Sequence, residues 1–159
     1  MKTILKRSVP NHELSKKFAQ DFFENYLKNE PNFTVFFEGG LGAGKTYLIR
    51  DLLRQFGVTG EVTSPTYIFV NEYSLSRSEA KSTRAAHFDF YRLKNMDDFF
   101  ARGFSEIAED SNVSKFVEWS DRLPQEIQET FSGKKFIVRI DHGVAVGVRN
   151  ITLLDPQKT

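Results

Sequence analysis

The sequence predicts a three-layer α/β fold with a mixed, mostly parallel sheet and a late antiparallel hairpin. Residues 32–37 form an apolar, β-prone run, a glycine-rich loop follows, and residues 47–56 place apolar side chains at helical spacing. Strands and helices alternate early in the chain, which favours parallel strands joined by helices. Two β-prone runs late in the chain flank Gly143 and predict the hairpin.

The remaining elements are predicted from apolar spacing and from residues that begin or end helices. Asn11 is the expected N-cap of a first helix that ends near Asn29. Its apolar stripe is expected to contain Leu14 and Phe18. The other predictions are strands at 3–8, from 67 onward, at 85–92, 115–119, 134–141 and 146–154, helices at 95–102, 105–110 and 122–131, an exposed loop at 74–84 and a frayed tail at 155–159.

Composition indicates a globular protein. The chain has 159 residues, 40% of them apolar and 27% charged, so we expect a single domain over residues 1–159. The net charge of +1 gives no sign of a strongly basic nucleic-acid-binding surface, and the lack of cysteine excludes disulfides and thiolate metal sites. We find neither a signal peptide nor an apolar run long enough to cross a membrane, and we expect a cytoplasmic protein.

A phosphate-binding motif lies between the strand at 32–37 and the helix at 47–56. Gly39 to Thr46 fits G-x-x-x-x-G-K-[ST], the P-loop or Walker A sequence. Its glycines allow backbone N–H groups to surround phosphate oxygens, Lys45 reaches the β- and γ-phosphates, and the Thr46 hydroxyl binds Mg²⁺. The predicted nucleotide-binding residues of this segment are Gly39, Leu41, Gly42, Ala43, Gly44, Lys45, Thr46 and Tyr47.

Two acidic residues at strand positions are the candidates for placing the metal and for hydrolysis. The strand at 85–92 alternates, so its phenylalanines are expected to face the core while His87, Asp89 and Tyr91 face the nucleotide. Glu118 ends the short apolar strand at 115–119. A P-loop site needs such carboxylates to place Mg²⁺ and to orient water, so Asp89 and Glu118 are predicted to be catalytic and metal-binding. His87 is better explained as a hydrogen-bonded structural residue than as a base.

Four sequence blocks, in order, resemble the TsaE (YjeE) family, the bacterial ATPases of tRNA threonylcarbamoyladenosine biosynthesis. The resemblance covers about residues 11–153 and implies a single P-loop domain with weak, Mg²⁺-dependent ATP hydrolysis. It also implies TsaB-like and TsaD-like partner proteins, and tRNAs with adenosine beside the anticodon that are reached through their complex. The blocks are Gly42-Ala43-Gly44-Lys45-Thr46, Ser64-Pro65-Thr66-Tyr67, His87-Phe88-Asp89-Phe90-Tyr91-Arg92-Leu93 and Val117-Glu118-Trp119.

The resemblance adds roles for residues outside the P-loop. Thr66 matches a switch-like threonine near the γ-phosphate and joins Lys45, Asp89 and Glu118 among the predicted catalytic residues. Three further positions match residues near the nucleotide: Trp119, Arg149 and, more weakly, Ser15.

The loop departs from the family pattern at two positions. Gly40 stands where family members usually carry Asp, and Tyr47 stands where a second threonine is common. Neither change affects the phosphate-cradling glycines, Lys45 or Thr46, so nucleotide binding is still expected.

Other P-loop proteins remain as alternatives. A small-molecule or nucleoside kinase also opens with a P-loop, but it needs an arginine-bearing lid, for which only Arg77, Arg84 and Arg102 are candidates. A small GTPase would need an Asn-Lys-x-Asp sequence, which the chain lacks. A nucleotide-gated assembly module, in which slow hydrolysis resets a complex, overlaps with the family resemblance.

Overall fold

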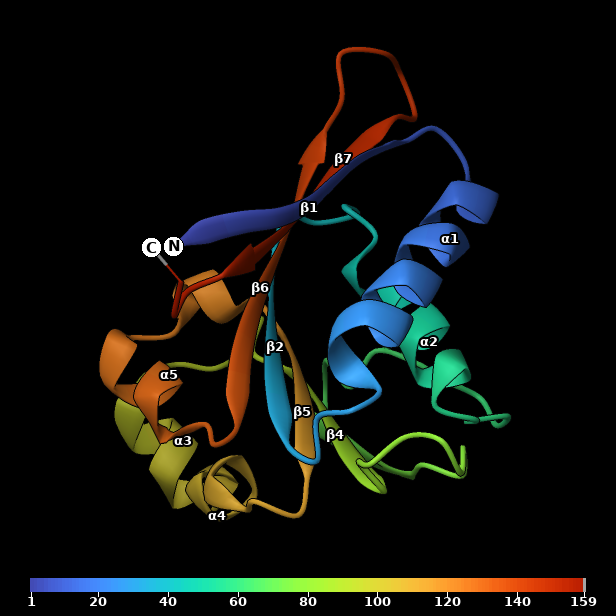
Figure 1. Ribbon diagram of the computed structural model, residues 1–159. Helices are drawn as coiled ribbons and strands as arrows, with labels where there is room; N and C mark the ends of the chain where they lie inside the picture. The colour runs from blue at the N-terminus through green and yellow to red at the C-terminus, as the bar shows by residue number, and fades with distance from the viewer. Residues whose placement is uncertain (159) are drawn as a thin grey trace.

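A computed structural model describes residues 1–158, and a seven-stranded sheet forms its centre (Figure 1). The order of the strands across the sheet is β1-β7-β6-β2-β5-β4-β3. The strands are β1 Lys2–Val9, β2 Phe33–Glu38, β3 Val70–Ser74, β4 Arg84–Asp89, β5 Ser114–Glu118, β6 Lys134–His142 and β7 Arg149–Asp155. The helices are α1 His12–Phe22, η1 Phe23–Leu27, α2 Lys45–Gln55, α3 Met96–Ala101, α4 Phe104–Glu109, η2 Ser120–Arg122 and α5 Gln125–Thr130.

The four central strands, β6, β2, β5 and β4, are parallel, and the outer strands β1, β7 and β3 pair antiparallel. Helices α1 and α2 cover one face of the sheet, and α3, α4 and α5 cover the other (Figure 1). The strands β6 and β7 form the late hairpin. The predicted three-layer α/β fold with a mixed sheet is therefore confirmed.

Alternation along the strands divides the core into two apolar clusters, one on each face of the sheet. In β5, Phe116 packs in the cluster beneath α1 and α2, whereas Val117 packs in the cluster beneath α3–α5. In β4, Phe88 belongs to the second cluster, and His87 and Asp89 point to the opposite face. The polar residues of β4 thus lie on the face that α2 covers, as the alternation predicted.

The first helix begins as predicted, but its later part differs. The Asn11 side chain accepts a hydrogen bond from the Leu14 amide (3.0 Å) and caps α1. The α-helical hydrogen bonding ends at Phe22, and the chain continues as the π-helix η1. Leu14 is exposed rather than part of the apolar stripe, whereas Phe18 is buried.

Three other predictions were wrong in whole or in part. Tyr67 lies in an exposed turn, because the backbone between Pro65 and Phe69 closes a tight loop before β3 begins. The predicted loop does lie between β3 and β4, at 75–83, but it is not exposed throughout, since Ser82 is buried and its hydroxyl bonds that of Ser114 (2.7 Å). Asp155 is not the start of a frayed tail: it pairs with Lys2 as the last residue of β7 and is buried. Residue 159 lies outside the described residues.

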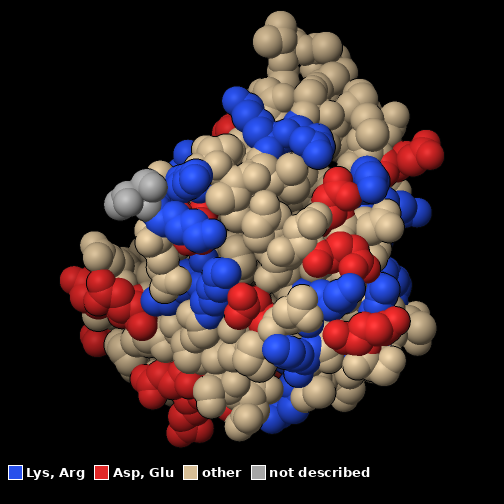
Figure 2. All heavy atoms as spheres, in the orientation of Figure 1, with Lys and Arg blue, Asp and Glu red and all other residues tan. Residues whose placement is uncertain are grey.

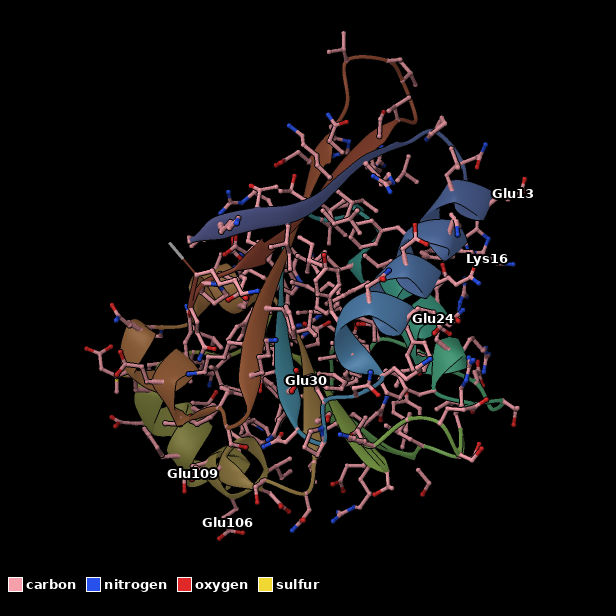
Figure 3. The ribbon with its side chains drawn as sticks, viewed as in Figure 1. Glu13, Lys16, Glu24, Glu30, Glu106 and Glu109 are labelled. Atoms are coloured by element: carbon pink, nitrogen blue, oxygen red, sulfur yellow. The ribbon has the colours of Figure 1, made fainter. Side chains whose placement is uncertain are left out.

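Charged side chains of the helices lie on the faces that point away from the sheet. Glu106 and Glu109 of α4 point away from the sheet, as do Glu13 and Lys16 of α1 (Figure 3). On the face shown in Figure 2, acidic residues gather over α3–α5 and basic residues lie nearer β1. Within residues 1–158, no helix combines the length and the apolar character needed to cross a bilayer.

Candidate nucleotide-binding site

The candidate site lies at the carboxyl ends of the parallel strands β2, β4 and β5. The loop after β2 leads into α2, and β4 and β5 end at Asp89 and Glu118, which pair with each other across the sheet. Ligands of open α/β sheets bind in the crevice outside the carboxyl ends of the strands. The topology therefore brings the predicted loop and both predicted acids to one edge.

The P-loop has the backbone conformation that its glycines allow. Gly42 and Gly44 have φ values of 73° and 102°, in the left-handed region that side chains disfavour. The turn is closed by a hydrogen bond from the Ala43 amide to the Gly40 carbonyl (3.1 Å). Helix α2 begins directly afterwards at Lys45, so its free N-terminal amides and its positive dipole end face the loop.

Lys45 lies inside this loop and is buried. Its ammonium donates hydrogen bonds to the carbonyls of Gly39 (2.6 Å) and Gly40 (2.9 Å). The same nitrogen lies 3.8 Å from the centroid of the Trp119 ring, which is a cation–π contact. Burial lowers the pKa of Lys45 below its usual 10.5, and the nearby Glu118 carboxylate offsets part of that effect. A polyanion is the ligand that such a partly desolvated ammonium favours.

Glu118 is buried and held by two donors that meet on a single oxygen. Oε1 lies 2.6 Å from the Thr46 hydroxyl, which donates to it, and 2.7 Å from Nε2 of His87. The other oxygen, Oε2, accepts no hydrogen bond from the described residues and is not fully enclosed. Glu118 thus presents one free carboxylate oxygen beside the hydroxyl of the P-loop threonine.

Asp89 is held in a different way. Its Oδ2 accepts hydrogen bonds from the hydroxyls of Ser64 (2.6 Å) and Thr66 (2.9 Å), and its Oδ1 accepts one from the Tyr91 amide (2.9 Å). Asp89 therefore connects the end of β4 to the loop that contains Thr66. The position of that loop and the position of the carboxylate depend on each other.

Two neighbouring hollows surround the P-loop. The first has a volume of about 300 Å³ and the second about 320 Å³. Residues 42–44 and Tyr47 line both hollows, so the loop and the start of α2 form their common wall. The first is lined by Leu41, Gly42, Ala43, Gly44, Lys45, Thr46, Tyr47, Ser64, Thr66, Asp89, Tyr91, Glu118 and Trp119.

The second hollow contains the predicted residues that lie far from the P-loop in the sequence. Ser15 of α1 and Arg149 of β7 both line it. Arg149 donates to the carbonyls of Ala43 and Gly42, at 3.3 Å each. Of all the predicted site residues, only Gly39 lines neither hollow, and it instead accepts the hydrogen bond of Lys45.

Several residues that line the two hollows were not among the predicted site residues. Ser64 and Tyr91 line the first hollow, and Asn11 and His12 line the second. The strand predicted at 85–92 placed Tyr91 on the face toward the nucleotide, but β4 ends at Asp89 and Tyr91 lines the hollow from the turn that follows. His87 was set aside as structural, and its contact with Glu118 depends on the pairing of β4 with β5, which the sequence does not give.

The donor set fits Mg²⁺ bound together with phosphates. Within residues 1–158 there is no group of three or more His, Cys, Asp or Glu side chains that could hold a metal ion by itself. Mg²⁺ in nucleotide sites is bound by one or two protein oxygens, by phosphates and by water. Thr46, with Glu118 and Asp89 beside it, supplies that kind of partial shell.

The family model for "Threonylcarbamoyl adenosine biosynthesis protein TsaE" matches residues 9–146, which include the P-loop and both acids. The chain belongs to the TsaE family. The role of this family is in tRNA threonylcarbamoyladenosine biosynthesis, and its membership confirms the resemblance seen in the sequence blocks.

Individual relatives agree with the family assignment. The TsaE protein of Haemophilus influenzae is 32% identical over 120 residues, covering 74% of this chain and 72% of the relative. The TsaE protein of Rickettsia prowazekii is 30% identical over 109 residues, covering 67% of this chain and 71% of the relative. The crystal structure of Bacillus subtilis YdiB has the same fold, with a TM-score of 0.59 at 21% identity over 96% of this chain and 86% of that one.

Proposed function

We propose that this TsaE family member is a Mg²⁺-dependent accessory ATPase. It hydrolyses ATP slowly and is required for threonylcarbamoyl modification of the tRNA adenosine beside the anticodon. It acts in the cytoplasm on a complex of TsaB-like and TsaD-like proteins, and it meets tRNA through that complex. One observation carries the proposal: Lys45, Thr46, Asp89 and Glu118 line one hollow at the start of α2.

Each of these residues has a defined task in the proposed reaction. The amides at the start of α2 and the Lys45 ammonium bind the phosphates of ATP. Thr46, Asp89 and Glu118 would hold Mg²⁺, which supplies charge neutralisation at the phosphates. The free oxygen of Glu118 orients the attacking water, and Asp89 keeps the Thr66 hydroxyl at the γ-phosphate side of the site.

The second hollow is suited to the remainder of the nucleotide. It adjoins the P-loop through Gly42–Gly44 and Tyr47, and it is lined by Ser15 and Arg149. Arg149 donates to two P-loop carbonyls and lines the second hollow, whereas the two acids line the first. We therefore assign Ser15, Arg149 and Tyr47 to binding of the nucleoside part, and Trp119 to positioning of Lys45.

The three candidate lid arginines argue against the kinase alternative. Arg77 bonds Glu24 and the Gln55 carbonyl, Arg84 pairs with Glu72, and Arg102 pairs with Asp98. None of them lines either hollow. A phosphotransferase would need such a cation at the transferring phosphoryl group.

Two assays test the proposal. Product analysis with Mg-ATP should detect inorganic phosphate and ADP without a phosphorylated acceptor. A reconstituted reaction with the partner proteins and tRNA should lose multiple-turnover modification when this protein or ATP is omitted. Full modification without this protein would refute the accessory role, and so would full modification by this protein without partners.

A further inference from the structure

His87 is a buried histidine that contacts one of the two acids of the site. It lies on β4, two residues before Asp89, and its side chain is fully buried. The ring crosses to β5, where Nε2 lies 2.7 Å from Oε1 of Glu118. In the register of the two strands His87 pairs with Phe116, so the ring reaches diagonally to the residue two positions further along β5.

The chemistry of the contact fixes which ring nitrogen carries a proton. An ionised carboxylate oxygen can only accept hydrogen bonds, so Nε2 must be the donor. Nδ1 has no hydrogen-bond partner and is fully enclosed. A proton on Nδ1 would be a buried donor without an acceptor, which is costly, so the arrangement favours the tautomer that carries its proton on Nε2.

This hydrogen bond decides how Glu118 presents its two oxygens. The Thr46 hydroxyl and the His87 ring both hold Oε1, at 2.6 Å and 2.7 Å. Two donors from different elements, α2 and β4, fix the plane of the carboxylate more strictly than one can. Oε2 accepts no hydrogen bond from residues 1–158 and is not fully enclosed, and Glu118 lines the first hollow.

We propose that His87 is a positioning residue for ATP hydrolysis, which donates from Nε2 to Glu118 and thereby directs the second carboxylate oxygen at the site of water attack. This inference rests on the proposed ATPase activity. His87 does not touch nucleotide or water in this role and acts only through Glu118. Mutation of a residue that orients a metal-binding carboxylate or histidine typically costs about 10–100-fold in metal affinity or activity.

A matched pair of substitutions separates positioning from packing. His87→Gln keeps an N–H donor that can reach Glu118, whereas His87→Met has a similar length and volume but no donor. We expect His87→Met to lower kcat by about 10–100-fold, with ATP affinity nearly unchanged, and His87→Gln to retain most of the activity. Thermal melts and ATP titration of both variants verify that they fold and bind.

A spectroscopic measurement on the wild-type protein tests the geometry without hydrolysis. Two-bond ¹H–¹⁵N correlations of the His87 ring should show the proton on Nε2. A proton on Nδ1 would overturn the inference, even if a variant failed to fold. Equal activity of the Gln and Met variants would also overturn it, provided that wild type hydrolyses ATP. No hydrolysis by wild type with its partners would instead refute the proposed function itself.

Discussion

Thr66 and Asp89 are joined by a hydrogen bond of 2.9 Å from the threonine hydroxyl to Oδ2 of the carboxylate. The same oxygen accepts from Ser64, so a buried acid at the end of β4 holds both hydroxyls of the preceding loop. Directly after Thr66, the large side chains of Tyr67 and Ile68 are 80% and 63% exposed. Asp89 thus anchors the loop that carries this exposed apolar pair.

Thr66→Ala is predicted to uncouple partner stimulation from ATP binding. Loops that contact γ-phosphate and Mg²⁺ order with nucleotide and relax after hydrolysis. Loss of the Thr66 hydroxyl removes one of the two hydrogen bonds that couple the loop to Asp89 and leaves the one from Ser64. We expect ATP affinity to change by less than about threefold, while partner-stimulated turnover and tRNA modification decline. Thr66→Ser restores the hydroxyl and is the control. Wild-type stimulation in Thr66→Ala would contradict the coupling.

Asp89→Asn and Glu118→Gln are predicted to stay folded and to lose most turnover. The oxygen of Gln can keep the hydrogen bonds from Thr46 and His87, because both donors meet on one oxygen. In Asp89→Asn, the amide oxygen can accept from Tyr91 while the hydroxyls of the loop rotate to accept from the amide nitrogen. General base catalysis typically contributes about 10²–10⁴-fold, so we expect losses in kcat of that order for Glu118→Gln.

Melting temperatures and steady-state phosphate release measure these two effects separately. Unfolded variants would leave the roles of the acids unresolved by kinetics, so the melts come first and the kinetic comparison uses the folded fraction. Normal ATP hydrolysis by both variants would show that the acids have been assigned wrongly.

The sequence predicted those parts of the site that depend on local pattern. The glycine spacing of the P-loop requires left-handed backbone at Gly42 and Gly44, and the structure has it. The alternation of β4 placed Asp89 on the face of the sheet opposite to Phe88, because side chains of a strand alternate whatever their tertiary surroundings are. The resemblance to the TsaE family supplied the other predicted site residues, including Ser15 and Arg149.

Features that depend on tertiary pairing could not be predicted from local pattern. His87 acquires its contact only because β4 and β5 lie side by side in a particular register. Tyr67 has the composition of a strand residue, but the turn closed by the Phe69 amide on the Pro65 carbonyl (2.6 Å) keeps it out of the sheet. Trp119 follows β5 with a φ of 61°, a rare conformation for a large side chain that places its ring beneath Lys45.

Arg149→Gln is predicted to weaken ATP binding, because Arg149 carries two hydrogen bonds to the P-loop and lines the second hollow. Hydrogen bonds that involve a charged group contribute about 1.5–3 kcal/mol. The partly exposed position reduces that figure, and we expect a loss of about tenfold in affinity, or about 1.4 kcal/mol. Calorimetric titration of Mg-ATP measures it.

Arg139→Gln is the matched control for this substitution. Arg139 lies on the neighbouring strand β6, pairs with Glu38 at 2.9 Å and lines neither hollow. The two variants change the net charge equally, so a loss confined to Arg149→Gln must come from the local contacts. Equal affinity in both variants would show that Arg149 does not support the loop.

The last prediction concerns Lys115, a fully buried lysine at the end of the sheet away from the P-loop. Its ammonium donates to the Ser132 hydroxyl (2.6 Å), to the Asp110 carbonyl (2.7 Å) and to the Asn32 side chain (3.3 Å). Burial lowers the pKa of Lys115 from 10.5 to about 8, against the opposing effect of the Asp110 carboxylate. The lysine therefore releases its proton at lower pH in the folded protein than in the unfolded chain.

The sign of the effect follows from which state binds more protons. Between the folded pKa of about 8 and the unfolded value of 10.5, the unfolded chain holds a proton that the folded protein has lost. The free energy of unfolding must then rise with pH in this window. From about pH 7.5 to about pH 10 the increase from this one group is about 2 kcal/mol.

Urea unfolding at these two pH values, compared between wild type and Lys115→Met, isolates the contribution. Tyr73, whose pKa is raised by burial, lowers stability at alkaline pH in both proteins, so its effect cancels in the difference. We expect wild type to gain about 2 kcal/mol relative to the variant as the pH rises. A difference that is constant with pH would mean that Lys115 has the same pKa in the folded protein as in the unfolded chain.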